Sequence, residues 1–404
     1  MKSAVEGTSP PTGARAEAPA ASQHRSAGGA SPRPTTTGEE PSSGDGISLP
    51  RRRHRRAQIV VAAAALLLFA LVLLSLGSGA VNIGASDVVV LTMAELGIIQ
   101  PDALEDYARR RAVLFAIRLP RVVAAVLVGA CLGVSGAALQ GLFRNPLAGP
   151  SLVGVSSGAA LATAAVIVIG PAVGGLWLRP LAAFAGSVIS TSLVYAMATR
   201  HGRTEVATML LAGVAINAIA GAGNGLFTFV ADDAELRDIT FWTLGSLGGI
   251  TWRSLFVTGP VMLLGIVLLP GLSRSLNTLL LGERQASYTG TNVQRTKVLS
   301  VALVAAGVGA AVSVSGIIGF VGLVAPHLVR LSIGPDYRTL MPGAAVLGAC
   351  LLLLADLVAR TIVVPAELPI GIVTALVGGP FFLWLLLRRR RGAARCGTCR
   401  QGIQ

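Results

Sequence analysis

Long apolar runs recur along the chain from Ala57 to Leu387, and short loops carrying most of the charged residues separate them. Runs of about 18 or more apolar residues are typical of helices that span a lipid bilayer rather than of a water-soluble core. The pattern predicts ten such helices, at residues 57–76, 112–142, 151–170, 180–199, 206–230, 250–270, 297–315, 317–333, 340–360 and 369–387. We therefore expect an all-α, polytopic membrane protein.

Arginine clusters indicate how these helices are oriented. Arg51–Arg56 precede the first apolar run and Arg388–Arg391 follow the last. Because such clusters stay cytoplasmic, both termini are expected inside, which requires an even number of spans. The outer loops then carry mostly acidic residues. The exception is the outer end of the second run, which carries Arg118, Arg121 and the triplet Arg109–Arg111. We interpret the triplet as membrane anchors.

Composition agrees with a membrane protein. The 404 residues are 53% hydrophobic and 13% charged, and the 49 glycines suit close helix packing. The net charge of +14 lies in basic clusters, loops and a basic tail, which favours a membrane surface as partner over nucleic acid.

Three regions follow from these patterns. Residues 1–56 form a disordered Pro/Ser/Ala-rich cytoplasmic tail with a basic end, 57–391 the membrane domain, and 392–404 a basic C-terminal tail. The C-x-x-C pair Cys396 and Cys399 in that tail would make only a weak zinc or redox site, and we interpret it as part of a solvated tail.

The residues needed for common catalytic chemistry are missing. The chain has two lysines, Lys2 and Lys297, and neither lies in a G-x-x-x-x-G-K-[ST] phosphate-binding loop. It has no HExxH zinc motif. We therefore predict no catalytic residue, no bound metal and no cofactor of its own.

Two further patterns are typical of transporters. Asp238–Gly249 is too short and too glycine-rich to span, which indicates a short amphipathic or re-entrant helix on the outer side. "GVSGAALQGLFRNPLAG" (Gly133–Gly149) weakly echoes "SVSGIIGFVGLVAPHLV" (Ser313–Val329) at an odd span offset, as an inverted repeat would.

Three longer blocks resemble a known family. Arg118–Ala159, Gly319–Arg330 and Leu351–Leu386 are similar to the FecCD-type permease subunits of ABC importers for iron–siderophores, haem and cobalamin. The resemblance implies a type II importer fold with inverted repeats, working as a homodimer in a bacterial plasma membrane. Two cytoplasmic ATPase subunits would bind the ATP, and an extracellular binding protein would deliver the cargo.

The resemblance also assigns roles to single residues. Arg118, Arg121 and Arg360 match outward-facing arginines that pair with glutamates of the binding protein. Such charge pairs favour fast, salt-sensitive encounters. The alternative is that these arginines reach the lipid headgroups, with Asp356 as a local partner of Arg360 on the same helix face.

The inner loop 271–296 occupies the place of the family's coupling helices, which fit a groove of the ATPase. Gly282, Glu283, Ala286 and Gly290 match that pattern, whereas "TGTN" (Thr289–Asn292) departs from it, which leaves the end of the second coupling helix open. An ordinary solvated loop is the alternative. Elsewhere, "RNPLAGP" (Arg144–Pro150) is expected to be structural at the inner mouth, with Asn145 as a cap, rather than to act as a gate. His327 is expected to pack rather than to bind a metal or haem.

Two stretches, Phe227–Gly249 and Gly141–Ala162, resemble haem permeases most. The fifth and tenth spans and the short outer helix would line the passage, with Asn217, Asn224 and Thr228 as its polar candidates or, alternatively, as helix-packing residues. A ferric siderophore or cobalamin is the alternative cargo. A secondary transporter would need intramembrane charges, for which Asp356 and Glu367 are the candidates.

Overall fold

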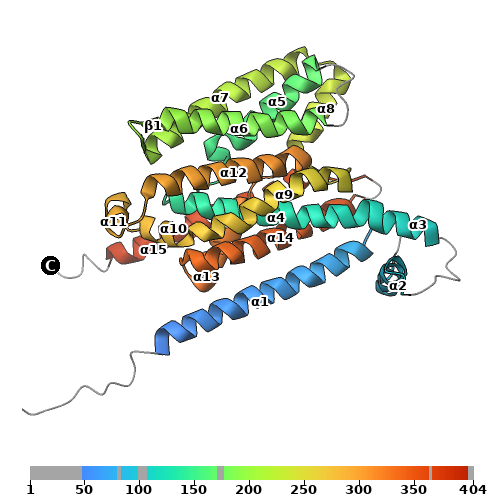
Figure 1. Cartoon of the computed structure of the whole chain (residues 1–404), viewed down its shortest axis with the longest axis horizontal. Coiled ribbons are helices and arrows are strands. Elements are labelled where there is room, and N and C mark those ends of the chain that lie inside the picture. The colour runs from blue at the N-terminus through green and yellow to red at the C-terminus, as the bar shows by residue number, and fades with distance from the viewer. Residues whose placement is uncertain (1–47, 80–82, 99–106, 171–176, 364–365, 399–404) are drawn as a thin grey trace, which may run out of the picture. The chain divides into compact units, whose positions relative to one another are not determined.

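The computed structural model describes residues 48–79, 83–98, 107–170, 177–363 and 366–398, and Figure 1 shows that nearly all of them are helical. The predicted disorder of residues 1–47 lies outside this part of the chain. The elements are α1 (Ser48–Gly77), α2 (Ala85–Glu95), α3 (Tyr107–Ala112), η1 (Val113–Arg118), α4 (Leu119–Leu142), η2 (Pro150–Val153), α5 (Val155–Ile169), α6 (Leu178–Ala198), β1 (Thr199–Arg200), β2 (Arg203–Thr204), α7 (Val206–Val230), α8 (Asp233–Leu244), α9 (Trp252–Leu268), η3 (Leu269–Leu272), α10 (Ser273–Leu279), α11 (Glu283–Tyr288), α12 (Val293–Ser315), α13 (Val321–Ile333), α14 (Tyr337–Thr361) and α15 (Ile370–Thr398).

The expected membrane helices are present. Within the described residues, seven helical stretches are long and apolar enough to cross a bilayer, and three shorter apolar helices accompany them, at Val155–Ile169, Val321–Ile333 and Ile370–Leu385. Together they correspond to the ten predicted spans, so the all-helical, polytopic fold class is confirmed. The second span is longer than predicted, since it begins at Tyr107 rather than at residue 112.

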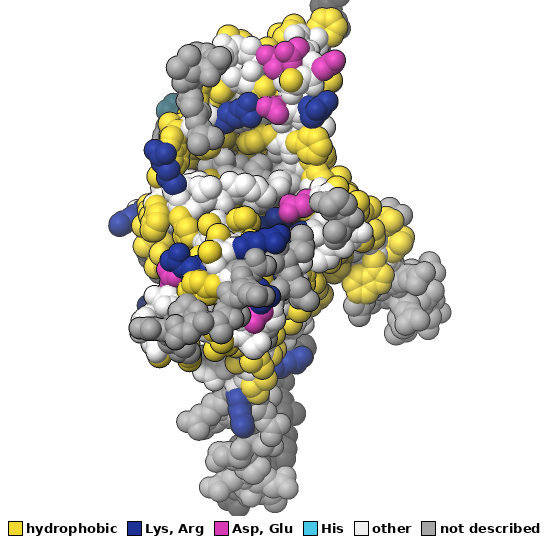
Figure 2. Space-filling view, turned by 90° about the vertical axis from the view of Figure 1, so that its right-hand side faces the viewer, with side chains coloured by type: hydrophobic (Ala, Val, Ile, Leu, Met, Phe, Trp, Pro, Cys, Tyr) yellow, Lys and Arg dark blue, Asp and Glu magenta, His cyan; other side chains and the backbone are white. Residues whose placement is uncertain are grey.

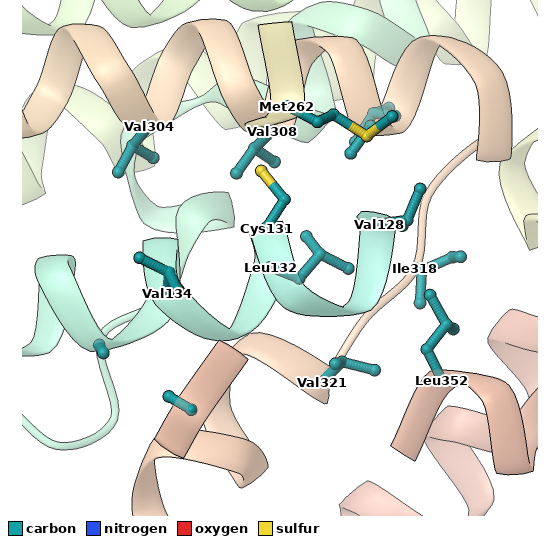
Figure 3. Packing of buried hydrophobic residues seen from close by; sticks show 14 of the residues in the cluster. Val128, Cys131, Leu132, Val134, Met262, Val304, Val308, Ile318, Val321 and Leu352 are labelled. Atoms are coloured by element: carbon teal, nitrogen blue, oxygen red, sulfur yellow. The ribbon is translucent and has the colours of Figure 1, made fainter. Parts of the chain in front are cut away.

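Helix α4 lies at the centre of the main helix group. It packs against α9, α12, α13 and α14, and Figure 3 shows Cys131 of α4 directed toward Val308 of α12 and Met262 of α9. Glycines bring α4 against its neighbours backbone to backbone: a Cβ built on Gly129 would lie 2.5 Å from the Gly348 carbonyl oxygen of α14. Close approach through small residues is the usual way in which membrane helices gain packing energy.

Helices α5, α6 and α7 form a second group. They pack against one another, and α12 contacts α6 and α4, so that this one helix joins the two groups (Figure 1). The connection from α6 to α7 is a two-stranded hairpin, in which Thr199 of β1 pairs with Thr204 of β2.

The helix leading into α4 contains a π-helical turn, η1. The Leu119 N–H bonds to the Leu114 carbonyl five residues back, which leaves the Phe115 carbonyl to accept a 2.7 Å hydrogen bond from the Trp252 indole. Pro120 follows immediately and has no N–H to donate. A π-turn changes which residues share a helix face, and such turns occur frequently at functional sites.

Two of the predicted region boundaries fall inside helices. Helix α1 begins at Ser48, so residues 48–56 are helical backbone, and α15 continues to Thr398, past residue 391. Cys399 and the side chain of Cys396 lie outside the described residues. The two similar segments, Gly133–Gly149 and Ser313–Val329, also differ in local structure. Gly133–Leu142 is continuous helix, whereas Gly316–Phe320 is a non-helical segment between α12 and α13. The inverted repeat therefore stays a prediction.

Candidate functional site

Three arginines converge at one end of the main helix group. Arg118 comes from η1, Arg121 from α4 and Arg360 from α14, and their side chains are almost completely buried. Together with Asp356 of α14 and Glu367, we call them the arginine cluster. The π-turn and α4 place Arg118 and Arg121 facing the interior. The preceding helix α3 carries three other arginines, Arg109–Arg111.

Arg121 binds both carboxylates of the cluster. Its Nε donates to Asp356 Oδ1 at 2.9 Å, and its Nη1 donates to Glu367 Oε1 at 2.8 Å. The Asp356 side chain is fully buried, while that of Glu367 is 46% exposed. The predicted Arg360–Asp356 pair exists as a longer ion pair of 3.7 Å. The arginine cluster therefore ties α4 to α14 and to the segment before α15.

Arg118 and Arg360 bind the end of α1. Arg118 Nη1 donates to the carbonyls of Leu76 and Gly77, and Arg360 donates to those of Ser75 and Ser78, at 2.6 to 3.1 Å. The last carbonyls of a helix have no partner within it and carry its negative dipole end, so guanidinium groups stabilise them. These two arginines thus cap α1 and hold it to the bundle.

This geometry bears directly on the predicted docking role. All three side chains are buried and have partners within the chain, among them the predicted partner Asp356 of Arg360, so they form no open positively charged surface. The half-exposed Glu367 is the part of the cluster that faces outward. Docking of a partner at the arginine cluster remains a prediction, and the partner would meet Glu367 first.

Two of the neighbouring arginines pair with acidic residues of α2. Arg110 pairs with Asp87 at 2.9 Å, and Arg111 pairs with Glu95 through two hydrogen bonds of 2.6 and 2.8 Å. The hydrogen bonds from Arg111 lower the pKa of the Glu95 carboxyl. Our interpretation of Arg110 and Arg111 as membrane anchors is therefore incomplete, since they attach α2 to α3. Figure 2, which views this end of the molecule, shows basic and acidic side chains intermixed on it.

The predicted coupling residues lie at the opposite end, around α11 (Figure 1). Gly282 precedes the helix with a φ of 110°, and Gly290 follows it with a φ of 81°, which are backbone conformations that favour glycine. Ala286 is fully buried, and Glu283 forms a 2.7 Å ion pair with Lys297. Helix α11 ends at Tyr288, and Asn292 caps α12 by accepting a hydrogen bond from the Arg295 N–H. The unusual "TGTN" residues are therefore the turn between the two helices.

Sequence reasoning missed the residues that face outward here. Leu281 and Tyr288 are 63% and 88% exposed, and Arg284 is exposed as well. A partner lying on α11 would contact these side chains, whereas the four predicted residues shape the segment. Large apolar residues flanking a short helix between two apolar spans were the available signal.

An apolar cavity of about 550 Å³ lies between the end of α8, the 316–320 segment and α15. Its lining includes Leu244, Ile317, Phe320, Ile372 and Leu376 and contains no charged residue. Backbone hydrogen bonds join the segments next to it: the Ser246 N–H donates to the Ser315 carbonyl at 2.8 Å, and the Ile370 N–H donates to the Gly245 carbonyl at 3.0 Å. Irregular backbone at membrane depth is tolerated where protein satisfies it in this way. The short helix predicted at Asp238–Gly249 corresponds to α8, which begins earlier, at Asp233, and ends at Leu244.

The three polar candidates of α7 lie elsewhere. Asn217 accepts a hydrogen bond from Ser157 at 2.5 Å and donates to the Ser151 carbonyl at 3.0 Å, so it holds α7 to α5 and η2. Thr228 donates to the Asn224 carbonyl within α7. None of the three lines the apolar cavity. The contacts of Asn217 are those of the helix-packing alternative, and a role of the three residues in the passage stays a prediction.

The remaining motifs are structural in their contacts. Asn145 accepts a hydrogen bond from the Leu147 N–H in the turn after α4, and Pro150 begins η2. His327 is buried, with its ring edge-on to that of Phe381 at 6.1 Å. Among the described residues, no group of three His, Cys, Asp or Glu side chains comes together as a metal site.

The structure and the sequence are similar to those of known transport proteins. The structure superposes on an inward-facing transporter described as of the metal-chelate ABC type, with a TM-score of 0.72 and 31% sequence identity, covering 82% of this chain and 99% of that one. The chain is 46% identical to the hemin transport system permease protein HmuU of Yersinia pestis, over 79% of its own length and 93% of that protein. It is 47% identical to the cobalamin import system permease protein BtuC of Halobacterium salinarum, over 69% and 74% of the two chains.

The fold and these likenesses define a multi-pass membrane permease of the ABC importer class. Residues 66–388 match the FecCD transport family, and the chain belongs to that family.

Proposed function

We propose that the chain is the permease subunit of a haem importer. The apolar, uncharged cavity between α8 and α15 carries the proposal, because a flat apolar ring needs a passage with little fixed charge. The likeness to the hemin permease of Yersinia pestis supports the same cargo. Cobalamin is the second candidate, favoured by the comparable identity to the cobalamin permease.

Reconstitution tests the cargo. Proteoliposomes containing the chain, with the ATPase and binding protein encoded near it, are expected to take up haem in an ATP-dependent manner, at least tenfold faster than a ferric siderophore or cobalamin. Faster uptake of cobalamin than of haem would make the cargo assignment wrong. Uptake that needs a proton gradient but no ATP would instead indicate a secondary transporter.

The proposed assembly has two copies of the chain, two ATPase subunits that bind the ATP, and one extracellular binding protein. Helix α7 supports the homodimer: Gly221 and Gly225 lie one turn apart on an exposed surface, with no atom near the position of an added Cβ. Glycines spaced in this way let two membrane helices approach closely. We propose that both termini are cytoplasmic, on the side of α11 and of the ATPase.

Glu367 offers a direct test of docking at the arginine cluster. If the binding protein presents a carboxylate to Arg121, it competes with Glu367, which already accepts from Arg121 Nη1. Glu367→Gln is therefore expected to raise the affinity of the chain for its binding protein severalfold at low salt, with a smaller effect at high salt. Equilibrium binding in detergent or nanodiscs measures this.

Asp238→Asn is the matched control, because Asp238 is also a half-exposed carboxylate paired with an arginine, Arg179. It is expected to leave the affinity unchanged. Unchanged or weaker binding by Glu367→Gln would show that docking does not use Arg121.

A further inference from the structure

Lys297 is a buried cation that the proposed function does not use. It lies in the first turns of α12 and is only 2% exposed. Its Nζ forms a 2.7 Å ion pair with Glu283 of α11 and donates a 2.5 Å hydrogen bond to the Thr204 carbonyl of β2. It is one of two lysines in the chain, the other being Lys2.

Thr204 is bound to α12 through three of its atoms. Besides the carbonyl held by Lys297, its N–H donates to Gln294 Oε1 at 3.1 Å, and its Oγ1 accepts from Gln294 Nε2 at 2.7 Å. The Gln294 amide also donates to the Tyr195 hydroxyl of α6 at 2.6 Å. Thr204 Oγ1 also donates to the Tyr195 hydroxyl at 2.8 Å, so these contacts join Thr204 to α12 and to α6.

Thr204 lies directly before the start of α7, so the contacts of Lys297 connect α7 with α11. Glu205 is the N-cap of α7, so the residue bound by Lys297 lies immediately before the cap. At the other end of the contact, Glu283 is the first residue of α11, the segment where the ATPase is proposed to bind. One ammonium group therefore joins α11 to the start of α7, and its bond to Thr204 links residues 93 positions apart in the sequence.

We propose that Lys297 is a positioning residue that transmits movement of α11 to α7, the helix whose exposed glycine face is proposed to meet the second copy. This rests on the proposed ATPase coupling at α11. When the ATPase shifts α11, the ion pair carries Lys297 with it, and the hydrogen bond to Thr204 carries the start of α7. Lys297 is buried whereas the Glu283 side chain is 41% exposed, so separation of the pair would leave the buried ammonium group without its counter-charge.

Lys297→Met tests the proposal in the reconstituted complex of chain, ATPase and binding protein. It keeps a long apolar side chain but removes the ion pair and the hydrogen bond. We expect binding of the ATPase and its rate of ATP hydrolysis to stay within about twofold of wild type, and cargo uptake per ATP hydrolysed to fall at least tenfold. Arg295→Met is the matched control, since Arg295 is an exposed cation on the same turn of α12, and it should leave the ratio unchanged.

A purely structural lysine would behave differently. Loss of folded protein lowers uptake and ATP hydrolysis together, so their ratio would not change, and an unchanged ratio overturns the proposal. Glu283→Ala, which removes only the ion pair, should lower the ratio in the same direction and serves if Lys297→Met does not fold. If the wild-type complex shows no ATP-driven uptake, the proposed function itself fails, and this inference fails with it.

Discussion

Replacing Asp356 by alanine is expected to lower the free energy of unfolding by about 3–5 kcal/mol, as for removal of one partner of a buried ion pair. Asp356 is fully buried, accepts from Arg121 Nε at 2.9 Å, and lies 3.7 Å from Arg360 Nε. Without it, two buried guanidinium groups lose their shared counter-charge. Thermal or denaturant unfolding of the purified chain in detergent measures the loss.

Asp238→Ala is the surface control for this experiment. Its pair with Arg179 has a similar length, 2.8 Å, but both side chains are about half exposed. Exposed pairs contribute about 0–1 kcal/mol, so this variant should unfold almost as the wild type does. Equal effects of the two variants would mean that the arginine cluster is not a buried, stabilising unit.

The sequence predicted which arginines belong together and one of their partners, but not the other partners. The Arg360–Asp356 contact is a local one on a single helix, so spacing alone indicated it. The shorter contact from Arg121 to Asp356 joins residues 235 positions apart in the sequence. The π-turn that places Arg118 facing the interior has no periodic sequence pattern from which it could be predicted. Long-range partners of this kind depend on helix packing, which a hydrophobic pattern does not specify.

In the coupling segment around α11, too, the sequence predicted some features, while others depend on how the helices pack. Glycines at 282 and 290 mark positions with positive φ, which a sequence motif can indicate. That Ala286 faces inward while Leu281 and Tyr288 face outward depends on how a six-residue helix sits on its neighbours. Such a helix is too short for its own periodicity to define a buried face. Lys297 was visible in the sequence only as a lysine outside any phosphate-binding motif, because its partners Glu283 and Thr204 lie on other elements.

The spans themselves were predictable, since each is a run of apolar residues bounded by charged or glycine-rich loops. The close contacts between them were not. Gly136 of α4 shows this clearly: a Cβ at this position would overlap the backbone carbonyl of Gly322 in α13 and lie 2.9 Å from its Cα. Glycine there is a packing requirement between two helices, although a helix interior generally favours alanine.

Gly136→Ala is accordingly expected to destabilise the chain by more than about 3 kcal/mol, at or beyond the upper end of typical overpacking effects. The added methyl meets backbone atoms, which have no alternative rotamer, so α4 and α13 must move apart. Movement of α4 also disturbs its contacts with α9, α12 and α14, because α4 packs against all of them. Little monodisperse protein should be recovered after extraction in detergent.

Gly379→Ala is the control for this packing effect. Gly379 lies within α15, and no neighbouring atom lies within 4 Å of an added Cβ. The same substitution should there change stability by no more than about 1 kcal/mol, because helix propensity favours alanine whereas Pro380 disfavours a Cβ on the helical residue before it. A difference of at least about 2 kcal/mol between the two variants corresponds to roughly a thirtyfold change in the ratio of folded to unfolded protein. Similar stability of both variants would show that α4 and α13 do not pack backbone to backbone.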